Sequence, residues 1–433
     1  MKKGYVKGII FGIVLLNWVI CLFVIPNFLI VRGPAAVDKI DEGPYAGNYL
    51  VTDGFGSIKI INFTANQIVW QTDEPNFFVH DSQMMPGGNS VLVGDSAADY
   101  VFEMNLSTKE IIWEWYGKNN TKEQDSYCDY LNWTKFGLQW GWNEEARSIV
   151  ENLRPASGFY THLNTVQFLK GSNYNRTYDS VLISLRNFDL IIEVNYTAKR
   201  GEAAYRNITW HYGIPGNHSI LFHQHCPKRW SNGHMTICDS ENARVIEIDE
   251  KDQIVWEYRD KNLRWVRDCD LLPNGNYLIT DSNNNRVIEV NMTAGGQIIR
   301  SFSSLLFNPY SAELTDDNKV VVSIDLGASI IVFDYGTGQI VQIVGFNYII
   351  APAMITFLII ATYQATDLSF SWKKMKGKPW KQRITTQTIY SKLILVIISV
   401  LTILVLNYIL IFLWHYSIWH ILENIPRPSW WGP

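Results

Sequence analysis

One phrase recurs six times along this chain and limits its fold more than any other feature. In its clearest copy, a strand opens at Asn232-Gly233-His234, a second strand spans 244–249, and a third begins with Gln253-Ile254-Val255-Trp256. The next copy opens at Asn274-Gly275, 42 residues further along. Short strands repeated at this spacing are typical of propeller blades.

The remaining copies keep the order of the strands and of the polar residues between them. They open near Asn48, Asn89, Ser180 and Lys319. A further strand precedes the opening turn, as at 221–227, so each copy supplies four strands. Four strands make one blade, and the sequence therefore predicts an all-β, six-bladed β-propeller around a central channel. We expect the Trp residues that recur in the last strands to pack between blades.

Three long apolar runs lie outside the repeats, at 9–31, 343–361 and 393–414. Each is long enough to span a bilayer, and the basic stretch between the last two favours a cytoplasmic loop. The alternative for the first run is a signal peptide. The expected parts are a transmembrane anchor at 1–32, an extracellular propeller at 33–342 with a Trp-rich insertion at about 115–160, a transmembrane helix at 343–362, a basic cytoplasmic loop at 363–388, a transmembrane helix at 389–414 and an extracellular Trp-rich tail at 415–433.

Glycosylation signals agree with a propeller on the extracellular side of a cell membrane. Asn-x-Ser/Thr occurs at Asn62, Asn105, Asn119, Asn132, Asn175, Asn195, Asn207, Asn217 and Asn291. Each motif alone is weak, and several coincide with the Asn that ends a strand of the repeat, so a structural role is the alternative. The net charge of −4 argues against a nucleic-acid partner.

Four cysteines lie in the expected extracellular part, where disulfides persist. They are the disulfide candidates Cys128, Cys226, Cys238 and Cys269. Cys226 and Cys238 flank the Asn232-Gly233 turn, a position from which they could face each other across a hairpin. The sequence does not determine the connectivity.

The Trp-rich insertion has two interpretations. An insertion of this length lies on one face of a propeller, where it would cover the channel mouth and hold an aromatic ligand. The alternative is a glycosylated surface excursion that touches the membrane.

Basic side chains recur at one position of the blades. His80, His225 and Arg267 each lie eight residues before the Gly of an opening turn. His162 and Asn164 lie two apart in the third blade, as do His223 and His225 in the fourth, so each pair shares one face of a strand. First strands line the channel of a propeller, and these side chains are therefore expected to converge there, with Lys228 and Arg186 nearby.

Such a cluster has three interpretations. The imidazoles could bond to backbone carbonyls and hold the ring of blades together. A metal site is disfavoured because carboxylate ligands are expected to be sparse there, and because Arg repels a cation. A polyoxyanion such as sulfate fits best, since His⁺ and Arg donate charge-assisted hydrogen bonds to its oxygens.

Several short phrases resemble those of the arylsulfate sulfotransferases, over about residues 45–340. The phrases are His80-Asp81, His162-x-Asn164, Ser184-x-Arg186 and Gln224-His225, followed by Asn232-Gly233-His234 and Asp239. The resemblance implies a six-bladed propeller that moves sulfuryl groups from a phenolic sulfate to a phenol without a nucleotide donor or other cofactor. It also implies that His225 is the nucleophile and forms a sulfohistidine.

The same resemblance implies that His80, His162 and Arg186 bind the sulfuryl oxygens, with Asn164, His223, Arg267 and Lys228 as further substrate-binding candidates. An imidazole that attacks sulfur divides the transfer into two steps, and a neighbouring His near its ordinary pKa would protonate the leaving phenol. The chain departs from the family's bacterial periplasmic enzymes in lacking an N-terminal β-domain and in having three apolar runs. The alternatives are a sulfatase-like hydrolase and a non-catalytic propeller that serves as a binding or structural subunit of a membrane complex, with membrane lipid and membrane proteins as partners.

Overall fold

The computed structural model describes the propeller part of the chain. The described residues are 31, 33–54, 57–72, 78–117, 133–152, 160–198, 202, 207–293, 295–325 and 329–345. They belong to one compact unit, Ile30–Gly345. The basic loop, the tail and nearly all of the three apolar runs lie outside the described residues. Among the residues that are described, none forms a helix of the length and apolarity that a bilayer requires.

Six antiparallel sheets of four strands make up this unit. The first three are β1 (Pro34–Lys39), β2 (Tyr49–Asp53), β3 (Ser57–Asn62), β4 (Gln67–Gln71); β5 (Val79–Met84), β6 (Ser90–Asp95), β7 (Tyr100–Asn105), β8 (Ile111–Tyr116); and β9 (Leu163–Leu169), β10 (Ser180–Leu185), β11 (Leu190–Asn195), β12 (Ile208–Tyr212). The last three are β13 (His225–Arg229), β14 (Met235–Asp239), β15 (Arg244–Ile248), β16 (Ile254–Tyr258); β17 (Val266–Leu271), β18 (Tyr277–Asp281), β19 (Arg286–Asn291), β20 (Gln297–Phe302); and β21 (Pro309–Leu314), β22 (Lys319–Ile324), β23 (Ser329–Asp334), β24 (Ile340–Gly345).

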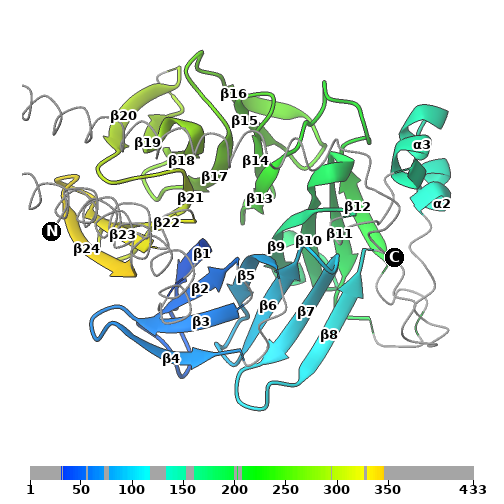
Figure 1. Ribbon diagram of the computed structural model, residues 1–433. Coiled ribbons are helices and arrows are strands. Elements are labelled where there is room, and N and C mark those ends of the chain that lie inside the picture. Colours follow the sequence, from blue (N-terminus) through cyan, green and yellow to red (C-terminus); the bar gives the residue numbers. More distant parts are fainter. Residues whose placement is uncertain are drawn as a thin grey trace, which may run out of the picture. The chain divides into compact units, whose positions relative to one another are not determined.

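The first strands of the six sheets form a closed ring. Each contacts the first strand of the next sheet, and β21 returns to β1 (Figure 1). Short 3-10 turns interrupt the blades at Gly171–Tyr174, Arg186–Phe188 and Ser282–Asn284. The predicted six-bladed β-propeller is therefore confirmed. The last strand continues to Gly345, three residues beyond the expected end of the propeller and into the second apolar run.

Within a blade, the inner strands are more buried than the outermost strand. The second strands are nearly all buried, as β6 shows at every position. In the outer strand β4, by contrast, only Trp70 is buried. Its indole Nε1 donates to the backbone oxygen of Leu106 in the next blade at 2.8 Å. Trp256 likewise packs on Tyr277 of the following blade, so these two recurring Trp residues join blades as predicted.

Two acidic positions of the repeat have structural roles. An Asp ends the second strand of four blades and accepts a backbone N–H from the segment that enters the first strand, as Asp239 does from Phe222 at 2.7 Å. A Glu of the third strand accepts from the next blade, as Glu247 does from the Tyr277 hydroxyl at 2.9 Å. In the third blade the Asp position is Leu185, and the chain turns directly into Arg186.

The described part of the insertion forms two helices, α2 (Trp133–Gln139) and α3 (Glu144–Asn152), beside blade three (Figure 1). Trp133 packs edge-on against Phe188, and its indole donates to the backbone oxygen of Gly117 at 2.9 Å. Trp140 stacks on His211 of the outer strand β12. No described residue of the insertion lines the channel cavity reported below, so the described helices do not form the expected aromatic ligand site.

Candidate functional site

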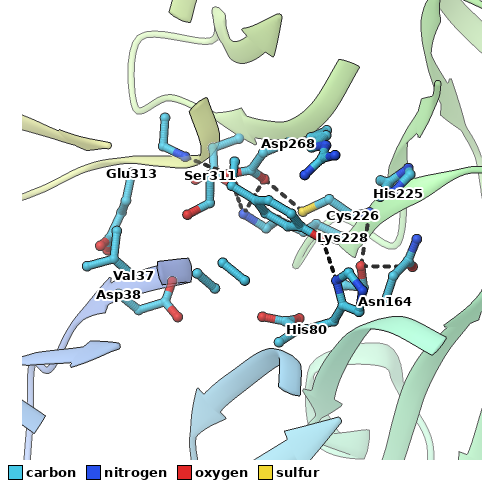
Figure 2. Close-up of a pocket in the computed structure, with 18 residues that line it drawn as sticks. Val37, Asp38, His80, Asn164, His225, Cys226, Lys228, Asp268, Ser311 and Glu313 are labelled. Carbon is cyan, nitrogen blue, oxygen red and sulfur yellow. Dashed lines mark hydrogen bonds and ion pairs between the residues drawn. The ribbon is translucent and has the colours of Figure 1, made fainter. Parts of the chain in front are cut away.

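A cavity in the channel is lined by side chains from the first strands of all six blades (Figure 2). Its volume is about 60 Å³, several times the roughly 10–15 Å³ that one water molecule needs. One end holds His80, Asn164 and His225, and the other holds Asp38 and Glu313.

The first strands place side chains in two layers around the channel; of the layers' members, Gln83 and Gln167 do not line the cavity. We call the first the histidine layer; it consists of His80, Asn164, His225, Arg267 and Tyr310. We call the second the carboxylate layer; it contains one residue from each blade, Asp38, Gln83, Gln167, Lys228, Asp270 and Glu313, opposite equivalent positions of the second strands.

Every first strand changes register at or beside the histidine layer. The change falls between Val79 and Asp81 in β5, and between Val266 and Asp268 in β17. A bulge interrupts the alternation of side chains between the two faces of a strand. As a result, neighbours such as His80 and Asp81 both line the cavity.

His225 is buried and is held by its Nδ1 atom. This nitrogen lies 2.8 Å from Ser240 Oγ and 3.1 Å from the backbone oxygen of His223. The Ser240 hydroxyl lies 2.6 Å from the backbone oxygen of Val266, a contact that uses its only proton. A carbonyl oxygen only accepts, so we assign the imidazole proton to Nδ1. The lone pair of Nε2 is then available to a ligand.

The other two imidazoles of the site lie against each other. The rings of His80 and His162 are 5.0 Å apart, and His80 Nδ1 is hydrogen-bonded to the Tyr310 hydroxyl. Asn164 is fixed from the neighbouring blade, because its amide donates to the backbone oxygen of Gln224 at 2.8 Å.

Two guanidinium groups accompany the imidazoles. Arg267 lies over the ring of Tyr310 at 4.1 Å, and its buried Nε has no hydrogen-bond partner among the described residues. Arg186 is 7% exposed and lies over the ring of Trp265 at 5.8 Å. It does not line the cavity itself, but its charge acts on His80, His162 and His225.

The imidazoles are neutral in this environment. Burial, reinforced by Arg267 and Arg186, lowers the pKa of His80 to about 3. Burial also lowers the pKa values of His162 and His225 well below the usual range, with Arg186 next for His162 and Arg267 next for His225. The expectation of a His near its ordinary pKa is therefore not met by these three buried imidazoles. The fixed positive charges are those of the guanidinium groups.

Carboxylates are more numerous in the channel than the sequence suggested. Asp38, Asp81, Asp268, Asp270 and Glu313 all line the cavity. The expectation that they are sparse was wrong because the bulges bring adjacent residues to the cavity. Among the described residues, however, no group of three or more His, Cys, Asp or Glu side chains is arranged to hold a metal ion.

The carboxylate layer joins neighbouring blades through backbone N–H groups. Gln83 accepts from Phe168 at 2.7 Å, and Gln167 accepts from Arg229 at 2.8 Å. Glu313 accepts from Lys39 at 2.8 Å, which connects the last blade to the first. The tie between blades that was one expected role of the imidazoles is made in this layer by Gln83, Gln167 and Glu313.

The carboxylates of this layer are only partly neutralised by cationic side chains. Lys228 pairs with Asp270 and, at 3.1 Å, with Asp268. Burial raises the pKa of Asp38 to about 7 and that of Glu313 to about 9. Lys228 was a candidate for substrate binding; it lines the same cavity as His80 and His225, but its ammonium group pairs with Asp268 and Asp270.

The remaining candidates lie outside the cavity or have other roles. His223 is in the left-handed region with φ of 50°, its ring lies 3.6 Å from a Glu241 oxygen, and its backbone oxygen orients His225. Gln224 donates to Ser184 Oγ at 3.1 Å, so two of the sequence phrases meet in the structure. Tyr310 was missed, although it lies eight residues before Asn318, whose positive φ matches that of the turn glycines.

The described cysteines correct the expected hairpin disulfide. Cys226, Cys238 and Cys269 are free thiols, and Cys128 lies outside the described residues. Cys226 falls in the bulge of β13, where His225 rather than Cys226 is opposite Cys238. Its thiol donates to Asp268 Oδ1 at 2.7 Å.

The strand-end sequons take part in turns. The side-chain oxygen of Asn105 accepts backbone N–H groups from Ser107 and Thr108, and that of Asn195 accepts from Ala198. Asn195 is only 6% exposed. The structural role is therefore real at these positions, whereas Asn207 is exposed. Asn119 and Asn132 lie outside the described residues.

Comparisons with known proteins do not identify a family. No protein-family model matches this chain, and no curated protein matches its sequence. Solved structures similar to it include virginiamycin B lyase from Staphylococcus aureus, at 12% identity over 73% of this chain and 84% of that chain, with a TM-score of 0.44. A protein of unknown function from Bacteroides caccae matches at 10% identity over 67% and 90%, with a TM-score of 0.42. These likenesses are too distant to support any argument about chemistry.

Proposed function

We propose that this protein is a membrane-anchored, extracellular aryl sulfotransferase that moves a sulfuryl group between phenolic compounds through His225. The observation that supports the proposal most is the state of His225. Its Nδ1 is bonded to Ser240 and His223, its ring is buried and neutral, and Nε2 keeps a lone pair beside two guanidinium groups.

The first step forms a bond between Nε2 of His225 and sulfur as the bond between sulfur and the aryl oxygen breaks. The phenolate leaves with the bonding pair. A neutral imidazole is the reactive form, so the depressed pKa of His225 favours this attack at neutral pH. In the second step a phenol oxygen attacks the same sulfur, its proton passes to a neighbouring imidazole, and Nε2 recovers its lone pair.

Arg267 and Arg186 supply charge for the sulfuryl oxygens and for the leaving oxygen. Fixed cations aimed at developing negative charge lower the barrier because they need no reorganisation. A bound sulfuryl anion also offsets the cationic field, and so raises the pKa of His80 and His162 toward values useful for proton transfer. Asn164 of blade three and Tyr310 of blade six add polar groups to the cavity.

The test is to incubate the full chain, purified in detergent, with 4-nitrophenyl sulfate and an acceptor phenol. We expect release of 4-nitrophenolate, sulfation of the acceptor, and a sulfuryl adduct on the peptide that contains His225 by mass spectrometry. His211→Asn, on the outer strand β12, is the matched control and should keep the adduct. An active wild type without that adduct would refute the role of His225, and a chain inert to every tested aryl sulfate would favour the non-catalytic binding propeller.

The topology is part of this proposal. The basic stretch at 363–388 and the distribution of sequons support a propeller outside the cell. Protease added to intact cells should spare Lys376 in the basic loop, and an endoglycosidase should increase the mobility of the propeller. Cleavage at Lys376 in intact cells would reverse the assignment.

A further inference from the structure

A tyrosine hydroxyl and an imidazole are paired at the histidine end of the channel cavity. Tyr310 lies in β21 of the last blade and His80 in β5 of the second, and both line the cavity. The Tyr310 hydroxyl is hydrogen-bonded to Nδ1 of His80 (Figure 2). Because blade one separates these two blades in the ring, the bond reaches across the channel and not between neighbouring strands.

The donor of this bond follows from the protonation states of the two groups. Burial lowers the pKa of His80 to about 3, so its neutral ring has one N–H and one lone pair. Burial raises the pKa of Tyr310, although Arg267 opposes that shift, so the phenol keeps its proton. A phenol O–H is the more acidic donor, and an imidazole lone pair accepts better than a phenol oxygen. We therefore assign the shared proton to Tyr310, which leaves the ring proton of His80 on Nε2.

This assignment gives opposite tautomers to the two imidazoles that line the cavity. His225 has its proton on Nδ1 and a lone pair on Nε2, whereas His80 has its lone pair on Nδ1 and its proton on Nε2. A ligand between them meets one nucleophilic nitrogen and one N–H donor. Such a donor can hold an aryl oxygen and protonate it as its bond to sulfur breaks.

We propose that the Tyr310 hydroxyl is the source of the proton that the leaving aryl oxygen receives, and that His80 relays it. As the bond between sulfur and oxygen breaks, the aryl oxygen keeps the bonding pair and takes the proton from Nε2 of His80. Nδ1 of His80 takes the proton of Tyr310, so the imidazole stays neutral and Tyr310 becomes a phenolate. In the second step the acceptor phenol gives its proton to Nε2, and Nδ1 returns its proton to Tyr310.

Arg267 is placed to stabilise the phenolate of Tyr310. Its guanidinium group lies over the Tyr310 ring at 4.1 Å, and its charge lowers the pKa of Tyr310 against the effect of burial. The relay needs no imidazolium, which a ring with a pKa of about 3 does not form at neutral pH. Tyr310 acts through His80 and is therefore a positioning residue that supplies and takes back one proton.

This inference rests on the proposed sulfuryl transfer, and its test separates the two. Tyr310→Phe removes the hydroxyl and keeps the ring beside Arg267. The full chain is assayed with 4-nitrophenyl sulfate, whose leaving group needs no proton, and with phenyl sulfate, whose phenolate is far more basic. We expect the loss in kcat/KM to be roughly 10²-fold larger with phenyl sulfate, at the lower end of what general acid catalysis contributes.

The matched control is Tyr160→Phe, which removes a tyrosine hydroxyl that donates to the backbone oxygen of Val150, outside the cavity. This variant should keep the wild-type ratio of the two rates. An active wild type whose Tyr310→Phe variant loses the same factor with both esters overturns the relay alone. A wild type inert toward both esters overturns the proposed transfer and the relay with it.

Nitrogen-15 NMR of the histidine-labelled chain tests the tautomer without any substrate. The signals of His80 are identified by their loss in His80→Asn. We expect the proton on Nε2 in the wild type and a mixture of the two tautomers in Tyr310→Phe, because the phenol no longer occupies Nδ1. A wild-type His80 with its proton on Nδ1 would overturn the relay even in an active protein.

Discussion

The two layers of the channel lie on the same first strands, five of which contribute to both, and differ in what their side chains bind. In the carboxylate layer, the side-chain oxygens of Gln83, Gln167 and Glu313 accept hydrogen bonds from backbone N–H groups of the next blade. In the histidine layer, His225 is held from behind through Nδ1, and its other nitrogen is left for a ligand. These residues of the carboxylate layer join neighbouring blades, whereas His225 of the histidine layer keeps a ring nitrogen for a ligand.

Residues at the bulges combine the two roles. Asp81 and Asp268 follow His80 and Arg267 directly, and all four line the cavity. Asp81 also accepts the backbone N–H of Val166 at 2.9 Å, and Asp268 accepts that of Ala312 at 2.9 Å, each from the next blade. Lining the cavity therefore does not by itself separate a ligand-facing side chain from one that joins blades.

The largest effect is expected on the rate of sulfuryl transfer, from substitutions in the histidine layer. His225→Asn should abolish sulfuryl transfer, because an amide cannot replace the nucleophile. His80→Asn should lower the rate by roughly 10²–10³-fold, about 2.7–4 kcal/mol, by analogy with the loss of one oxyanion-hole donor. The measurement is 4-nitrophenolate release, with His211→Asn as control. An active His225→Asn protein would contradict the assignment of the nucleophile.

The next effect is on stability, from the carboxylate layer. Glu313→Ala leaves the backbone N–H of Lys39 without its acceptor and should lower the free energy of unfolding by about 1–3 kcal/mol. Glu313→Gln keeps an oxygen in place and should cost less. Urea unfolding measures both. Equal losses in the two variants would show that the bond between the first and last blades contributes little.

The two layers should also respond to pH in opposite directions. The pKa of His80 is depressed from 6.5 to about 3, so the unfolded chain binds a proton first and stability falls as pH drops through that window. The pKa of Glu313 is raised from 4.5 to about 9, so its contribution to stability is present below 4.5 and is lost as pH rises toward 9.

Melting temperatures from pH 4 to pH 9 separate these contributions. His80→Asn should flatten the acid side of the profile and leave the alkaline side unchanged. Glu313→Gln should do the reverse. A variant that shifts the whole profile without changing either slope would show that the residue's ionisation is not linked to folding.

The smallest effect is expected between the layers, at Thr165. Its hydroxyl oxygen accepts the backbone N–H of Cys226 at 3.0 Å, and Thr165→Val removes that acceptor at nearly constant volume. We expect a loss of about 1 kcal/mol in unfolding free energy, with both pH slopes unchanged. A loss larger than that of Glu313→Ala would reverse the ranking of the two positions.

The sequence by itself determined the number of blades and the position of the channel residues within them. A period of about 42 residues is a local property, because every copy carries its own apolar strands and turn. Counting back from the turn glycines located His80, His225 and Arg267, and the same count from Asn318 would have located Tyr310.

Only the tertiary structure decided which of these residues act together. Each register change is a bulge of a first strand against the second strand of its own blade, so period-two alternation could not reveal that Asp81 and Asp268 share the cavity. The partners of Lys228 likewise come from the adjacent blade, as does the Val266 oxygen that orients the Ser240 hydroxyl beside His225. These contacts join residues that are far apart in the sequence, and the repeat pattern alone does not predict them.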